Sequence, residues 1–93
     1  GVGGAVAHAV GKALAALAVK RQVLCVTHLP QVASYAAGHF SIAKEVSKGR
    51  TATKVLALAE PQRRDEIARM LSGRETTKAA LKAAEELMEA AQS

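Results

Sequence analysis

Residues 22–27 (QVLCVT) form a short, nearly unbroken apolar run, and this run constrains the fold more than any other part of the chain. A run that does not alternate with polar residues is typical of a strand covered on both faces in a parallel sheet. A helical pattern over residues 4–19 precedes it, so the two together predict half of an α/β repeat. Because the chain has no second run of this kind, we expect the neighbouring strands to lie upstream of Gly1.

The first helix and the buried strand carry specific expectations for single residues. Cys25 lies in the middle of the strand with no cation nearby, so it is expected to be a small buried hydrophobe. As the single cysteine, it also excludes an intrachain disulfide. In the helix, the larger apolar residues recur at helical spacing and predict one apolar stripe of Val6, Val10, Leu14 and Leu17.

The remaining two thirds of the chain predict a short helix, a β-hairpin and two further helices. Pro30 is well placed to begin a helix over residues 30–37, and Gly38 to end it. Residues 39–46 and 51–59 alternate around the turn SKGR, which is typical of an antiparallel hairpin. Helices are expected over residues 61–72, ended by Gly73, and over residues 75–91. The residues expected to share an apolar face are Phe40 and Ile42; Leu56 and Leu58; Ile67, Met70 and Leu71; and Leu81, Ala84, Met88 and Ala91, flanked by Leu87.

The composition predicts a domain that depends on a partner surface. Its 93 residues suffice for one small domain, and its apolar content is built on 21 Ala, with one Phe, one Tyr and no Trp. Ala contributes little burial per residue, so we expect weak stability in isolation or a partner that completes the core. No apolar run approaches the ~20 residues of a membrane span, and no signal peptide is evident. The expected compartment is the cytoplasm.

The formal net charge of +5 is unevenly distributed. Residues 1–59 hold seven Lys or Arg and one Glu, whereas residues 60–93 hold six Lys or Arg and seven acidic residues. The basic part is compatible with an ordinary solvated surface or with one that faces DNA or phosphate. The three histidines have no metal-ligand spacing, so no metal site is predicted within the chain.

His28 is the strongest candidate for chemistry. It ends the apolar strand and precedes a helix begun by Pro30, and ligands of open α/β sheets sit at the carboxyl ends of strands. An imidazole can accept or donate a proton near neutral pH, so it could contact a γ-phosphate or orient an attacking water. The alternative is a histidine that caps the following helix or hydrogen-bonds within the loop.

The sequence GVGG at residues 1–4 is a second, weaker candidate. A glycine-rich turn before a helix presents backbone N–H groups to an anion. However, it lacks the GxxxxGK[ST] form of a phosphate loop and no lysine follows it. A flexible loop is the alternative interpretation.

These segments occur in an order that resembles the end of the RecN family of bacterial DNA-repair proteins, relatives of the SMC ATPases. The resemblance rests on a glycine-rich turn, a helix, a strand ending in THLPQVA, the hairpin HFSIAKE…GRTATKVLAL, and ARMLSG near the end. It covers essentially the whole chain and implies an α/β fold. Residues 1–93 would then be the C-terminal fragment of an ABC/SMC-type P-loop ATPase head.

The resemblance also implies roles for single residues. Gly1, Gly3 and Gly4 look like the tail of the D-loop, where the backbone would come close to the bound nucleotide. His28 looks like the switch histidine. Walker A, Walker B and the ABC signature motif are missing from these residues, so the chain by itself is not expected to bind or hydrolyse ATP. In the complete protein the resemblance implies ATP and Mg²⁺ as cofactors. The implied partners are the rest of the head, a second head in a homodimer, and DNA in the bacterial nucleoid.

A different class of function also fits the charge and size of the chain. It could be a free-standing basic module that binds nucleic acid or a protein partner without catalysis. Such a module should melt cooperatively as a monomer, and salt-dependent DNA binding by the isolated chain would favour it. A part of an ATPase head should instead be unstable or self-associate through exposed strand edges.

Overall fold

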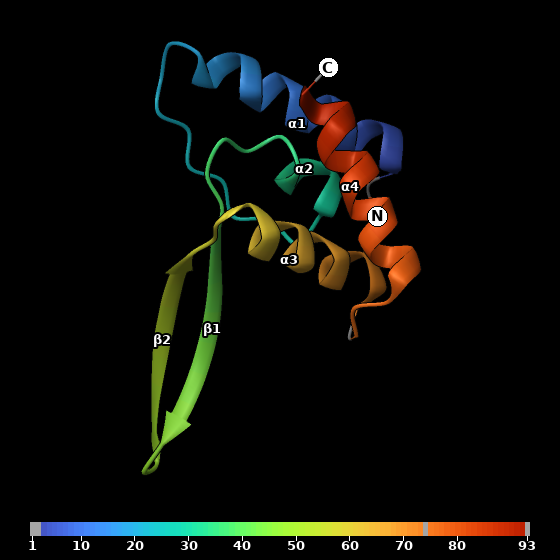
Figure 1. The fold of residues 1–93 in the computed structure, drawn as a ribbon. Helices are drawn as coiled ribbons and strands as arrows, with labels where there is room; N and C mark the ends of the chain where they lie inside the picture. Colours follow the sequence, from blue (N-terminus) through green and yellow to red (C-terminus); the bar gives the residue numbers. More distant parts are fainter. Residues whose placement is uncertain (1–2, 74, 93) are drawn as a thin grey trace.

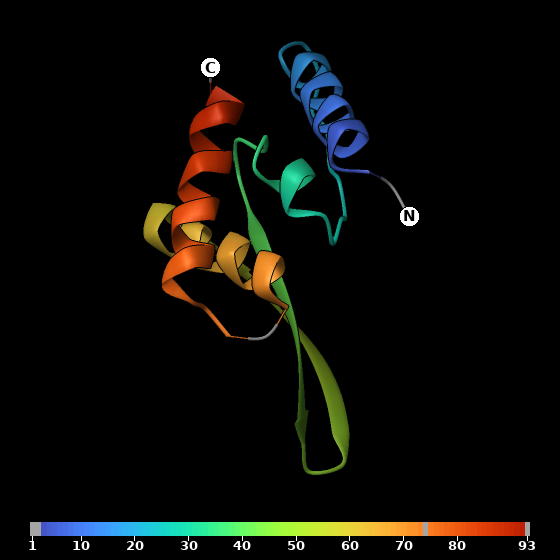
Figure 2. The same cartoon turned by 90° about the vertical axis from the view of Figure 1, so that its right-hand side faces the viewer.

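A computed structural model describes residues 3–73 and 75–92 as four helices and one β-hairpin (Figure 1). In chain order the elements are α1 (Gly4–Ala18), α2 (Pro30–Ala33), β1 (Phe40–Ser47), β2 (Arg50–Ala57), α3 (Glu60–Ser72) and α4 (Lys78–Gln92). Figure 2 separates two packed helix pairs, α1 with α2 on one side and α3 with α4 on the other. This arrangement is a mixed helical and antiparallel fold, compatible with the predicted α/β class.

The helix α1 packs on α2 through its smallest residues. Ala7 and Gly11 are buried on this face, and a Cβ atom added at Gly11 would lie 2.5 Å from Cδ2 of Tyr35. The predicted stripe of larger residues is not the buried face: Val6 is 56% exposed, and Val10 and Leu17 are exposed as well. Small residues let α2 approach closely, whereas the larger ones lie on a face that nothing in the described chain covers.

Residues 22–27 do not form the predicted strand. The segment has no regular secondary structure, and Leu24 and Val26 are 87% and 85% exposed. Cys25 is also exposed, so the expectation that it is buried is wrong. The physical reason is that a strand is stabilised by pairing with a neighbour, and the described residues offer this segment none. The neighbouring strands were expected upstream of Gly1, and that expectation stays a prediction.

The helix α2 is one turn long, shorter than the predicted span of 30–37. Pro30 occupies its first position, as expected, and the helix gives way to turns after Ala33. Gly38 does not end it, since Ser34 is the residue that caps the helix. A single helical turn has little stability of its own, so its place depends on packing against α1 and α3.

The hairpin forms with the predicted turn. Lys48 and Gly49 both have positive φ (52° and 77°), which suits a two-residue turn that follows the twist of the strands. The register pairs Ile42 with Val55, so Phe40, Ile42 and Val55 share one face. Leu56 pairs with Ser41 and lies on the other face. The strands project away from the helices, and their apolar residues are exposed (Figure 1).

The helices α3 and α4 enclose the main core. Its buried residues are Ile67, Ala68, Ala80, Ala84 and Met88, with Leu81 and Leu87 partly buried against them. Gln62 accepts a hydrogen bond from the backbone N–H of Ala59 at 2.9 Å at the start of α3. Gly73 ends this helix with φ of 86°, as predicted. The predicted apolar faces are confirmed at Ile67, Ala84 and Met88, whereas Leu71 is exposed.

Candidate functional site

His28 lies in the irregular stretch between α1 and α2, where it is exposed. The residues on either side of it are fixed: the hydroxyl oxygen of Thr27 accepts a hydrogen bond from the backbone N–H of Leu29 at 3.0 Å. The carbonyl of Leu29 in turn accepts from Val32 and Ala33, which anchors the loop to α2. Within the described ranges the His28 ring has no hydrogen-bond partner, so its imidazole is free to meet a group from outside the chain.

The glycine-rich start lies at the N-terminus of α1. Gly1 is outside the described residues. Gly3 has extended backbone angles, and its carbonyl accepts the first helical hydrogen bond from Ala7 at 3.0 Å. Gly4 is the first residue of α1. Neither glycine contacts a side chain that a Cβ would displace, so this end of the helix is sterically open.

The pairing of α1 with α2 places both predicted segments in one helical unit. The rings of His8 and Tyr35 meet edge to face with centroids 6.0 Å apart, and Gly11 lets the two helices approach. No hydrogen bond joins Gly3 or Gly4 to His28 in the parts of the chain that the structure describes. Both segments therefore adjoin the same packed pair of helices.

Sequence reasoning missed Arg63, which is the buried charge nearest to this unit. Its Nη2 donates to the carbonyls of Ala33 (3.1 Å) and Ser34 (3.2 Å) at the end of α2. A signal was available, because Arg63 precedes the core residue Ile67 by four positions and so shares its helical face. Because arginine is usually exposed, a sequence pattern assigns such a residue to the surface.

His39 is half-buried beside the same arginine. Burial lowers the pKa of His39, the positive charge of Arg63 lowers it further, and the negative charge of Glu66 opposes both. Its Nδ1 atom is buried without a hydrogen-bond partner among the described residues. The surroundings thus favour the neutral imidazole, and the sequence alone offered no partner for this residue.

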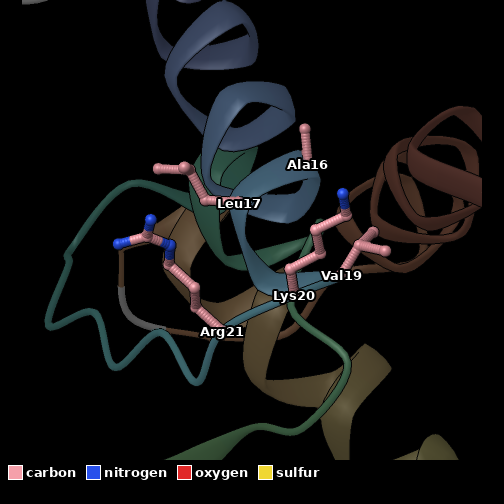
Figure 3. A pocket seen from close by; sticks show the side chains of 5 residues that line it. All are labelled: Ala16, Leu17, Val19, Lys20 and Arg21. Atoms are coloured by element: carbon pink, nitrogen blue, oxygen red, sulfur yellow. The ribbon is translucent and has the colours of Figure 1, made fainter.

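His28 lines neither of two open hollows found on the described part of the chain. The first, of about 430 Å³, lies at the C-terminal end of α1 (Figure 3). There Leu17 and Arg21 point to one side and Val19 and Lys20 to the other. The second lies between α3 and α4 and is lined by Glu60, Pro61, Arg64, Glu85, Met88, Glu89 and Gln92. Both hollows are open to solvent, so neither has the enclosed form of a small-molecule site.

The described residues hold neither a metal-ligand cluster nor a helix suited to a membrane. Residues 3–73 and 75–92 contain no group of three or more His, Cys, Asp or Glu side chains that could hold a metal ion. In the same ranges, no helix combines the length and apolarity needed to cross a bilayer. On the hairpin, Lys54 lies 3.5 Å from Glu45 in an exposed ion pair, so part of the basic charge there is balanced.

Comparison with known proteins identifies the family. No protein-family model matches the chain. Nineteen curated proteins match it, and those compared in detail are named DNA repair protein RecN. The RecN of Deinococcus radiodurans is 51% identical over 88 residues, which cover 95% of this chain and 15% of that protein. For Bacillus subtilis and Vibrio cholerae, the identities over 91 residues are 44% and 45%, covering 98% of this chain and 16% of each relative.

The matches run through nearly the whole chain, including the THLPQVA segment and the hairpin, but the chain spans only 15–16% of the length of these relatives. The part they share with it is C-terminal. The predicted resemblance is therefore confirmed at the level of the family. The chain belongs to the RecN family of bacterial DNA repair proteins and corresponds to a C-terminal part of them.

Proposed function

We propose that residues 1–93 form the C-terminal lobe of an ATP-hydrolysing head of the ABC/SMC type. The complete protein would act in the recombinational repair of DNA double-strand breaks. The observation that carries this proposal is the 43–51% identity to proteins named DNA repair protein RecN over 95–100% of the chain. A free-standing basic module is not favoured, because the matched proteins are several times longer than this chain.

Two uncovered surfaces support the assignment as one lobe of a larger head. Leu24 and Val26 lie on an irregular segment that has the composition of a buried strand but no paired neighbour among the described residues. On the hairpin, Phe40, Ile42 and Val55 form an exposed apolar face. Such surfaces are unfavourable in water and mark places where other protein packs. The proposed cover is the remainder of the same head, and the proposed partners of the complete protein are a second head and DNA.

We place the site for ATP and Mg²⁺ outside this chain. The sequence has no Walker A lysine or Walker B carboxylates, and the described residues contain no cluster of three or more His, Cys, Asp or Glu side chains. In the complete protein, nucleotide and Mg²⁺ would be held mainly by residues outside this chain. When bound, the metal ion would neutralise charge on the phosphates during transfer to water.

The contribution of this chain is proposed to be His28, together with the glycine-rich start of α1. His28 is exposed, lies beside a fixed backbone and has a ring without a partner in the described ranges, as a group that meets a phosphate from outside would require. Gly1, Gly3 and Gly4 are proposed as the D-loop tail, where small residues allow close backbone approach. His28 would be the switch histidine, sensing the γ-phosphate or orienting the attacking water.

The proposal is tested by measuring ATP turnover of the full-length protein that contains this chain. His28→Ala is expected to lower turnover by roughly 10²-fold, the lower end of what a positioned acid–base group contributes, with an unchanged circular dichroism spectrum. Lys12→Ala is the control, because Lys12 is exposed on α1 and has no proposed part in hydrolysis. Turnover of a folded His28→Ala protein within about twofold of the parent would reject the role of His28.

A further inference from the structure

Arg63 is a buried cation on an otherwise solvent-facing first turn of α3. Its exposed fraction is 6%, whereas Glu60 and Arg64 on the same turn have exposed side chains or surface ion pairs. A buried charge is costly unless it is paired and hydrogen-bonded. The position therefore has to be explained by what the guanidinium binds.

The guanidinium of Arg63 binds the end of α2. Nη2 donates to the carbonyl oxygens of Ala33 and Ser34, which lie 30 and 29 positions earlier in the chain. Nη1 lies 3.8 Å from a carboxylate oxygen of Glu60, which supplies a negative charge on the solvent side. The last carbonyls of a helix have no partner within the helix, and the two hydrogens of Nη2 can reach two adjacent carbonyls. The carbonyl of Ala33 also accepts from the backbone N–H of Ala36 at 3.1 Å. A single helical turn is thereby tied to a longer helix.

The other end of α2 leads directly to His28. The carbonyl of Leu29 accepts the first hydrogen bonds of α2, and the N–H of Leu29 is held by the Thr27 hydroxyl. His28 lies between these two residues, so a displacement of α2 moves the backbone that carries its ring. Because α2 has one turn, hydrogen bonds at its far end affect its whole length.

We propose that Arg63 is a positioning residue that holds α2 against α3 and so fixes the place at which His28 is presented. The inference rests on the proposed function of His28. Arg63 lies at the far end of α2 from His28. Its hydrogen bonds go to the end of α2, its ion pair is with Glu60 on its own helix, and His39 lies beside it, so its effect on turnover would pass through the α2 backbone. The chain thereby couples the packing of its C-terminal helices to the segment that would meet the nucleotide.

The first test is whether the clamp exists, and it does not depend on hydrolysis. In the full-length protein, Arg63→Met is expected to speed hydrogen exchange of the hydrogen-bonded amides of α2 and of the turns that follow it, residues 32–36, by at least about tenfold. Arg64→Met is the matched control, since Arg64 is adjacent and binds Asp65 and Glu85 on the surface. Equal exchange in the parent and in both variants would overturn the proposal.

The second test separates positioning from a merely structural role. Arg63→Met is expected to lower kcat for ATP roughly tenfold with KM changed less than about twofold, and Arg64→Met to leave both unchanged. Combined with His28→Ala, Arg63→Met should cause no further loss. A double variant whose loss of kcat is the product of the two single losses would overturn the positioning role, and so would a normal kcat in Arg63→Met.

The two proposals fail in distinguishable ways. Normal turnover in His28→Ala rejects the role of His28 and with it the positioning role, while the exchange experiment still reports whether α2 is clamped. If Arg63→Met does not fold, Arg63→Lys takes its place in both experiments. Lysine keeps the charge but not the planar fork, so an intermediate loss of kcat and of protection is expected. Parent-like values in Arg63→Lys on both measures would overturn the proposal.

Discussion

Replacing Ile67 with Ala removes the largest side chain that the described residues bury completely. Ile67 is 0% exposed at the centre of the contact between α3 and α4. The substitution deletes the three carbons beyond Cβ, and at about 0.8 kcal/mol for each buried methylene the lost transfer free energy is about 2.4 kcal/mol. The cavity left beside Ala84 and Met88 raises the cost, so the free energy of unfolding should fall by about 2.5–4 kcal/mol. For a chain of 93 residues this is a large part of the total.

The measurement is urea unfolding of the isolated chain followed by circular dichroism, since the chain has no Trp and one Tyr to report by fluorescence. Leu24→Ala is the control, because Leu24 is 87% exposed and its loss should change the free energy of unfolding by less than about 0.5 kcal/mol. A cost below about 1 kcal/mol for Ile67→Ala, or an equal cost for both variants, would refute the assignment of the α3–α4 contact as the core of this chain.

Two further predictions concern the helices around the candidate site. Gly11→Leu should lower the melting temperature despite the better helix propensity of Leu, because even a Cβ atom at this position would lie 2.5 Å from Cδ2 of Tyr35. Ala13→Leu, on the exposed side of α1, is the control and should leave the melting temperature unchanged. A Gly11→Leu protein that melts at the temperature of the parent would contradict the close approach of α1 and α2. His39 makes stability depend on pH, because burial lowers its pKa from 6.5 in the folded chain while the unfolded chain keeps the ordinary value. Stability is therefore fully present above about pH 6.5 and is lost as the pH falls toward the lower folded pKa. His39→Gln should weaken the dependence of the free energy of unfolding on pH, measured by urea unfolding at several pH values across this window. An unchanged pH dependence would contradict the lowered pKa of His39.

Local patterns predicted the elements that are stabilised locally. The helical periodicity of residues 4–19 and the turn around Gly49 depend on neighbours in sequence, and both elements formed as expected. The end of α3 at Gly73 follows from its left-handed backbone, which glycine adopts without strain. These features need no information from distant residues.

The errors arose where structure depends on distant partners. Residues 22–27 have the composition of a central strand, but pairing decides whether a strand forms, and the described chain supplies no pair. In the same way, the stripe predicted on α1 consists of residues that could be buried, while Ala7 and Gly11 are those that α2 reaches. Periodicity identifies which residues share a face but not which face another element covers.

The candidate site was predictable in part for the same reason. His28 could be singled out because a strand-like run, a histidine and Pro30 are adjacent in sequence, and its role stays a prediction. Arg63 acts on carbonyls about thirty residues away, a relation that no local pattern contains. Its spacing of four positions from Ile67 places it on the buried face of α3, but the charge of its side chain argued against burial.

The central claim is that this chain is one lobe of a larger ATPase head, and the backbone amides of residues 22–27 test it most directly. Hydrogen exchange of these amides is measured in the isolated chain and in the full-length protein. The account predicts exchange close to that of an unstructured peptide in the isolated chain, and strong protection in the full-length protein, where the segment pairs with neighbouring strands. Fast exchange of residues 22–27 in the folded full-length protein would contradict the claim.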